Sequence, residues 1–194
     1  MTTARLETFS DGVLAIIITI MVLELGVPHE VGLEALRPLL PVFLAYALSF
    51  VNLGIYWNNH HHMLSTVERV NGAILWANLH LLFWLSLFPF MTAWMGENEF
   101  ASVPVALYGA VSLMAAIAYY VLQQAIVRDQ GSGSRLAAAL GRDLKGKISP
   151  GLYAGGVVFA NPLRWLSLSL YVIVALMWLI PDRRIEGAYR SRGD

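Results

Sequence analysis

The segment that decides the fold is residues 5–25, RLETFSDGVLAIIITIMVLEL, in which a charged start leads directly into a long apolar run. A helix needs about 20 apolar residues to cross the roughly 30 Å hydrocarbon core of a bilayer. Apolar blocks of similar length recur along the chain of 194 residues, of which 57% are hydrophobic and only 13% are charged. An ordinary soluble domain is about one quarter charged. The sequence therefore predicts an all-α polytopic membrane protein.

Six membrane-spanning helices are expected, within a single unit that covers residues 1–194. The apolar runs place them at about residues 5–26, 38–62, 70–95, 103–127, 142–160 and 163–180. The last two come from one long apolar stretch, which we divide at Asn161 and Pro162 because proline interrupts a helix. The first helix lacks the basic start and the small-residue cleavage site of a signal peptide, so we expect it to remain in the mature chain.

The distribution of basic residues predicts the orientation of these helices. With the N-terminus inside, the inner segments hold eleven of the 13 Lys and Arg, and only Arg37 and Arg164 lie outside. Basic residues are retained on the cytoplasmic side, so we expect both termini to be cytoplasmic in a multi-pass protein of the cell inner membrane. The formal net charge is zero, which argues against a nucleic-acid partner, and the absence of cysteine excludes disulfides and thiolate metal sites.

The first helix has one distinct face. At about 100° per residue, Gly12, Ile16, Thr19, Ile20 and Leu23 fall on a single stripe. Asp11 lies about 220° from Ile16 around the helix and therefore projects toward neighbouring helices. A carboxylate in a low-dielectric setting is costly unless it is paired or hydrogen-bonded, so Asp11 needs a partner there.

Polar partners are available on the second helix, in residues 56–62 (YWNNHHH), and on the third helix at Asn78 and His80. We expect a polar network that ties the first helix to its neighbours, formed by Arg5, Ser10, Asp11, Asn58, His60, His61 and Asn78. Which of His60, His61 and His62 takes part is left open. Three adjacent histidines are spread over about 200° of a helix, so they cannot all bind one metal, and we expect neither a metal site nor a cofactor.

Two motifs resemble those of one known family. The spacing of Arg5, Phe9, Ser10 and Asp11, followed by the apolar run, resembles the signature of the transmembrane protein 175 family, which comprises the lysosomal potassium channels and their bacterial relatives. Residues 57–61 (WNNHH) resemble the second-helix motif of that family. A single six-helix unit is similar to the bacterial members, which assemble as tetramers. The resemblance therefore implies a homotetramer with the first helices around a central pore.

The resemblance also implies roles for the stripe. In that family the first helix lines the pore, which implies a hydrophobic constriction at Ile16, further apolar positions at Ile20 and Leu23, and a selectivity role for Thr19. All four belong to the stripe obtained from helical angles alone. No TVGYG filter is present, so the expected preference for potassium over sodium is modest. Glu24, at the outer end, is expected to attract cations.

The expected function is passive conduction of potassium by a cation channel whose partners are other copies of itself, potassium ions and the bilayer. The alternative is a secondary transporter of a small cation or solute, but the broken helices, inverted repeats and midplane charges of that class are not evident. An intramembrane enzyme would need paired carboxylates, a metal motif or a nucleophile beside a base. A scaffold remains open, although it would not need a threonine among large aliphatic residues on one face.

Overall fold

The computed structural model describes residues 2–67, 69–131, 134, 136–137 and 144–179. Within that part every regular element is a helix, as predicted. The elements are α1 (Thr3–Leu23), η1 (Leu33–Leu39), α2 (Leu40–Leu64), α3 (Gly72–Ser86), α4 (Phe88–Glu97), α5 (Ser102–Gln130), α7 (Leu144–Phe159) and α8 (Arg164–Leu179). The predicted start of a helix at residue 142 and the predicted end of another at residue 180 lie outside the described residues.

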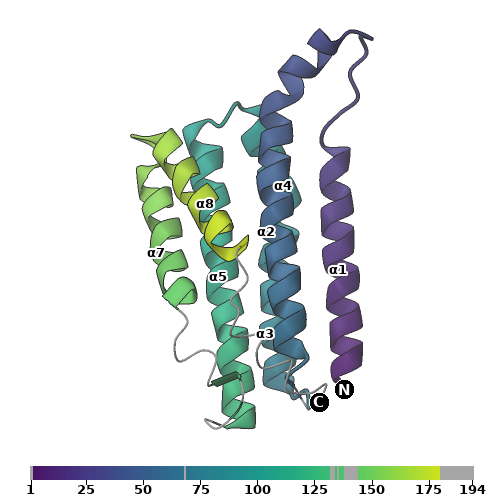
Figure 1. Cartoon of the computed structure of the whole chain (residues 1–194), viewed down its shortest axis with the longest axis vertical. Coiled ribbons are helices and arrows are strands. Elements are labelled where there is room, and N and C mark those ends of the chain that lie inside the picture. The colour runs from purple at the N-terminus through teal and green to yellow at the C-terminus, as the bar shows by residue number, and fades with distance from the viewer. Residues whose placement is uncertain (1, 68, 132–133, 135, 138–143, 180–194) are drawn as a thin grey trace.

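Four helical segments are long and apolar enough to cross a membrane, namely Thr3–Leu23, Leu33–Leu64, Gly72–Glu97 and Ser102–Gln130. The described parts of α7 and α8 have 16 residues each, and both border residues outside the described part of the chain. Figure 1 shows them at the edge of the molecule opposite to α1. The chain is therefore a multi-pass helical membrane protein with α7 and α8 at one side.

The predicted helix at 70–95 is two helices in the structure. Helix α3 starts at Asn71, whose side chain accepts a hydrogen bond of 2.9 Å from the Ile74 backbone N–H, as an N-cap residue does. The helix ends at Ser86, and α4 begins at Phe88, immediately before Pro89. Proline has no N–H to donate to the preceding turn, and it disfavours the helical conformation of the residue before it. The break was missed because α3 and α4 form one continuous apolar block in the sequence.

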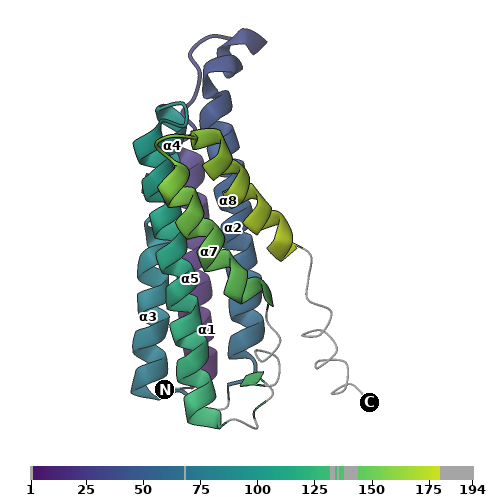
Figure 2. The ribbon, with the colours of Figure 1, turned by 90° about the vertical axis from the view of Figure 1, so that its left-hand side faces the viewer.

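Proline and glycine also determine other helix ends. The second span begins with the 3-10 helix η1, which projects beyond the bundle in Figures 1 and 2, and Pro41 follows in the first turn of α2. Helix α5 ends at Gly131, whose φ of +86° is readily adopted only by glycine. Helices α7 and α8 meet at Asn161 and Pro162, where the sequence was divided.

Helix α5 is the central element of the core. It packs against α3, α4, α7 and α8, whereas α1 packs against α2, α3 and α4. Tyr171 of α8 is fully buried between Gly109 of α5 and Gly156 of α7, and its hydroxyl donates to the Val105 carbonyl oxygen at 3.3 Å. Helix α1 is consequently an outer helix that uses only one of its faces for packing within the chain.

Candidate functional site

Helix α1 has a buried face and an exposed face. Its buried residues are Leu6, Ser10, Leu14, Ile17 and Met21, spaced by three or four as on one side of a helix. The predicted stripe lies on the opposite side, where Ile16, Ile20 and Leu23 are 59%, 43% and 75% exposed and where Gly12 and Thr19 are also exposed. The structure thus places all five stripe residues on the surface of the single chain.

Thr19 is the polar group in the middle of this exposed face. Its hydroxyl donates to the Ile16 carbonyl oxygen at 2.9 Å. Because that bond uses the only hydroxyl proton, the oxygen lone pairs remain free to face a cation or water. Glu24 is the residue that follows α1, and it is exposed at the end of the helix opposite to Arg5.

A chain of buried polar side chains joins α1 to α3 and α2. The Ser10 hydroxyl donates to the Leu6 carbonyl oxygen at 2.8 Å and accepts from the Asn78 amide at 2.9 Å. The Asn78 carbonyl oxygen lies 2.7 Å from His60 Nε2 and must accept, so that His60 nitrogen is the donor. Ser10, Asn78 and His60 are each at most 1% exposed. Three of the predicted network residues therefore form one continuous contact.

Two further contacts join α1 to α2 at the same level. Trp57 Nε1 donates to Asp11 Oδ1 at 3.1 Å, and His61 Nδ1 lies 2.6 Å from Glu7 Oε1. Trp57 and His61 stack with ring centroids 6.4 Å apart. The sequence analysis selected Asp11 and His61 for the network but not their partners Trp57 and Glu7. A signal was present, because Glu7 and Asp11, like Trp57 and His61, are four residues apart and so lie on the same face of their helix.

The remaining predicted network residues are not part of these contacts. Arg5 and Asn58 are both exposed, and neither makes a hydrogen bond or an ion pair within the part of the chain that the structure describes. His80, also considered as a partner, accepts a hydrogen bond from Trp84 Nε1 at 2.9 Å. Among the described residues, no group of three or more His, Cys, Asp and Glu is placed to hold a metal ion.

A second buried polar cluster, which the sequence did not indicate, joins α2, α4 and α5. Thr92 Oγ1 lies 2.7 Å from Ser49 Oγ, and Tyr108 OH accepts from Ser49 at 3.2 Å and from Asn52 at 3.0 Å. All four side chains are buried. Buried polar groups paired in this way fix the relative position of the helices that carry them. These hydrogen bonds therefore hold α2, α4 and α5 together behind α1.

Comparison with known proteins relates this arrangement to channels. Residues 5–89 match the family model described as "Endosomal/lysosomal potassium channel TMEM175". The chain is 55% identical over 191 residues to a potassium channel of Chryseobacterium sp., covering 98% of this chain and all of that protein. It is 32% identical to a potassium channel of Chamaesiphon minutus over 92% of this chain and 94% of that protein. The crystal structure of a lysosomal potassium-selective channel TMEM175 homologue from Chamaesiphon minutus superposes with a TM-score of 0.81, covering 92% of this chain and 96% of that one at 32% identity.

Proposed function

The chain belongs to the TMEM175 family of potassium channels, and we propose that it is itself a potassium-permeable cation channel. The observation that carries this proposal is the exposed face of α1. Large aliphatic residues and a threonine lie together on the outside of the chain. The other face of the same helix is buried against helices that buried hydrogen bonds hold together. Four copies of this face, arranged around an axis, would enclose a pore.

Each residue of the exposed face has a role in this proposal. Ile16, Ile20 and Leu23 would form successive apolar rings, which resist wetting and so require a small widening or rotation of the helices for ions to pass. Thr19 hydroxyl oxygens would replace part of the hydration shell of the ion between those rings. With one hydroxyl per subunit in place of a carbonyl filter, discrimination between potassium and sodium is modest.

Acidic side chains lie at both ends of α1. Glu24, exposed at one end, would form an acidic ring that raises the local cation concentration. At the other end, Glu7 and Asp11 contact the second helix. From the excess of Lys and Arg in the segments on that side, we place both termini in the cytoplasm. Similarity to the bacterial family members is what supports a homotetramer in the cell inner membrane.

The experiment that tests the proposal is a flux assay on purified protein in liposomes with an outward potassium gradient. We expect potassium efflux that needs no solute on the opposite side, and a slower efflux of sodium. Ile16→Ala should raise the flux and admit larger cations, because it removes bulk from the narrowest ring. Ile173→Ala, at a residue of α8 that is 49% exposed, is the matched control and should leave the flux unchanged.

Two outcomes would contradict the proposal. Efflux that occurs only when a solute is supplied on the opposite side would identify a secondary transporter, because exchange is coupled to a substrate. Equal flux from liposomes with folded protein and from empty liposomes would exclude passive conduction.

A further inference from the structure

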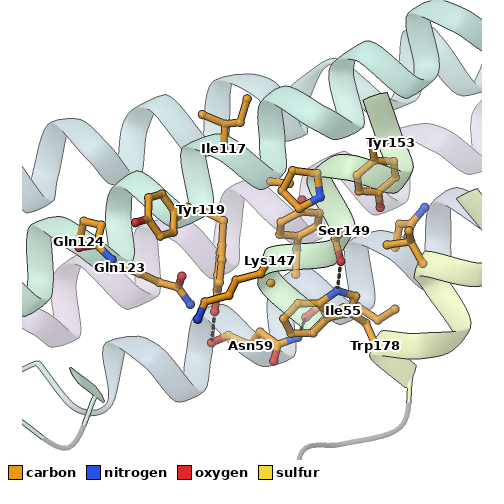
Figure 3. Close-up of a pocket in the computed structure, with 17 residues that line it drawn as sticks. Ile55, Asn59, Ile117, Tyr119, Gln123, Gln124, Lys147, Ser149, Tyr153 and Trp178 are labelled. Carbon is orange, nitrogen blue, oxygen red and sulfur yellow. Dashed lines mark hydrogen bonds between the residues drawn. The ribbon is translucent and has the colours of Figure 1, made fainter. Parts of the chain in front are cut away.

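A cavity lies on the side of the chain away from the exposed face of α1. Helices α2, α5, α7 and α8 enclose it, and its volume is about 440 Å³. That volume is within the roughly 300–1,000 Å³ of small-molecule sites. Figure 3 shows its lining side chains, among which Tyr119 donates to the Asn59 carbonyl oxygen at 3.2 Å and Trp178 donates to Ser149 at 2.8 Å.

One end of this cavity carries hydrogen-bond donors for which the described residues provide no acceptor. Gln123 is only 8% exposed, yet its amide makes no hydrogen bond within the described part of the chain. Lys147, from α7, lines the same cavity and makes no ion pair with a described residue. In Figure 3 the side chains of Lys147, Gln123 and Tyr119 converge on one end of the cavity. Because the Gln123 amide and the Lys147 ammonium face the cavity with donor capacity to spare, this end is suited to a ligand that accepts hydrogen bonds.

The charge of the lining specifies the sign of that ligand. Lys147 is the one charged side chain among the described lining residues, which include no Asp or Glu. A potassium ion would be repelled there, so the cavity is not part of the conduction path. A single ammonium group together with neutral amide donors matches a group with one negative charge and several acceptor oxygens. A phosphodiester has that chemistry.

The rest of the cavity is suited to the apolar part of an amphiphile. Its walls include Ile55, Val174 and the ring of Trp178. Tyr153, which is 3% exposed, also lines it, and its hydroxyl makes no hydrogen bond with a described residue. Ester oxygens of a lipid can accept from that hydroxyl. Two other lining residues, Ile117 and Tyr120, are also exposed on the outer surface of α5, where a membrane protein meets lipid.

The depth of the cavity agrees with this assignment. Gln123 precedes the last residue of α5, Gln130, by seven positions, so it lies about 10 Å along the helix from that end. This depth is close to the boundary between head groups and acyl chains. We propose that the cavity binds the phosphodiester head group of an anionic phospholipid through Lys147 and Gln123, with the start of the acyl chains between α2, α5 and α8.

Native mass spectrometry on the full-length protein in detergent tests this proposal. The probes are dioleoyl phosphatidylglycerol, dioleoylglycerol, which has the same acyl chains but no phosphodiester, and glycerophosphoglycerol, which is the anionic head group without acyl chains. We expect phosphatidylglycerol to bind about tenfold more tightly than dioleoylglycerol, as one charge-assisted hydrogen bond provides. Lys147→Gln and Gln123→Leu should each abolish this preference. Lys145→Gln removes the same charge from the same helix outside the cavity lining, and should retain it.

Other results would overturn the proposal. Equal affinity for the two lipids would mean that the cavity does not recognise an anion. Equal losses in Lys147→Gln and Lys145→Gln would mean that the preference reflects general charge. Binding of glycerophosphoglycerol as tight as that of the lipid would assign the site to a soluble phosphodiester. Because none of these readouts depends on ion flux, they are independent of the proposed channel function.

Discussion

Asn78 is the residue on which both halves of the buried polar chain depend. Its amide donates to Ser10 on α1, and its carbonyl oxygen accepts from His60 on α2. His60 Nδ1 is buried and has no partner among the described residues, so the bond through Nε2 is the one that satisfies the ring. Removing Asn78 would leave the His60 ring without a partner among the described residues, and Ser10 with only its hydrogen bond inside α1.

We therefore predict that Asn78→Leu destabilises the protein by about 1–3 kcal/mol, the usual penalty for leaving a buried polar group without a partner. The matched control is Asn58→Leu, because Asn58 is exposed on α2 and makes no hydrogen bond with a described residue. Thermal unfolding in detergent measures both. A transition temperature that falls equally in the two variants would show that the buried chain does not anchor α1.

Glu24 leads to a prediction about conduction. If four Glu24 carboxylates gather cations at the pore entrance, Glu24→Gln should lower single-channel conductance mainly at low ionic strength, where the screening length is about 30 Å at 0.01 M. At about 1 M salt, where the length is about 3 Å, the variant should match the wild type. A deficit that is the same at both salt concentrations would disprove the acidic-ring interpretation.

At the scale of residues, the sequence predicted which side of α1 would be buried but not every contact made there. Ser10, Asn78 and His60 could be anticipated because polar residues inside a span need partners. The partners of Asp11 and His61, namely Trp57 and Glu7, could not, since they depend on the register between α1 and α2. Spacing within one helix does not define that register.

At the scale of elements, the backbones of α2 and α4 approach so closely that Gly96 cannot carry a side chain without displacing them. A Cβ atom on Gly96 of α4 would lie 2.6 Å from Val42 Cα of α2, and backbone cannot move aside as the end of a side chain can. Gly96→Ala should therefore push α2 and α4 apart and cost about 1–3 kcal/mol, as overpacking does.

Gly151→Ala is the matched control for this test, because nothing lies within 4 Å of a Cβ at Gly151 of α7. That substitution should be neutral or stabilising, since alanine favours helix. Chemical denaturation of the two variants in detergent compares them directly. Equal stability of Gly96→Ala and wild type would mean that the contact between α2 and α4 is looser than described.

Helix α5 ends at Gln130, three residues beyond the predicted end at residue 127, whereas the boundary at Asn161 and Pro162 was predicted because proline stands there. The division at Leu87 was not, because Pro89 lies inside a continuous apolar block. Proline interrupts hydrogen bonding there, while hydropathy continues unchanged across it. Hydropathy indicates that a segment lies in an apolar environment, whereas the break between α3 and α4 depends on the backbone hydrogen bond that proline cannot make.

At the scale of the whole molecule, the single chain leaves the Ile16, Thr19, Ile20 and Leu23 face uncovered while burying the rest of α1. Helical angles placed these residues on one face, because periodicity within one helix is a local property. The family resemblance, and not the angles, implied that this face lines a pore. The cavity between α2, α5, α7 and α8 was not predicted, because its walls come from segments as distant as Ile55 and Trp178. Only tertiary packing brings these residues together.

The central claim, that this uncovered face lines a water-filled pore, is tested most directly by cysteine accessibility, since the natural chain contains no cysteine. Thr19→Cys and Leu23→Cys channels are recorded in planar bilayers before and after a cationic, water-soluble thiol reagent. Such reagents react with the thiolate form of cysteine, which forms where the side chain meets water. Val172→Cys, on α8 and 41% exposed, is the control for a surface that faces lipid. The account predicts an irreversible fall in current for Thr19→Cys and Leu23→Cys and none for Val172→Cys. Unchanged current in all three would mean that the face meets lipid and that ions pass elsewhere.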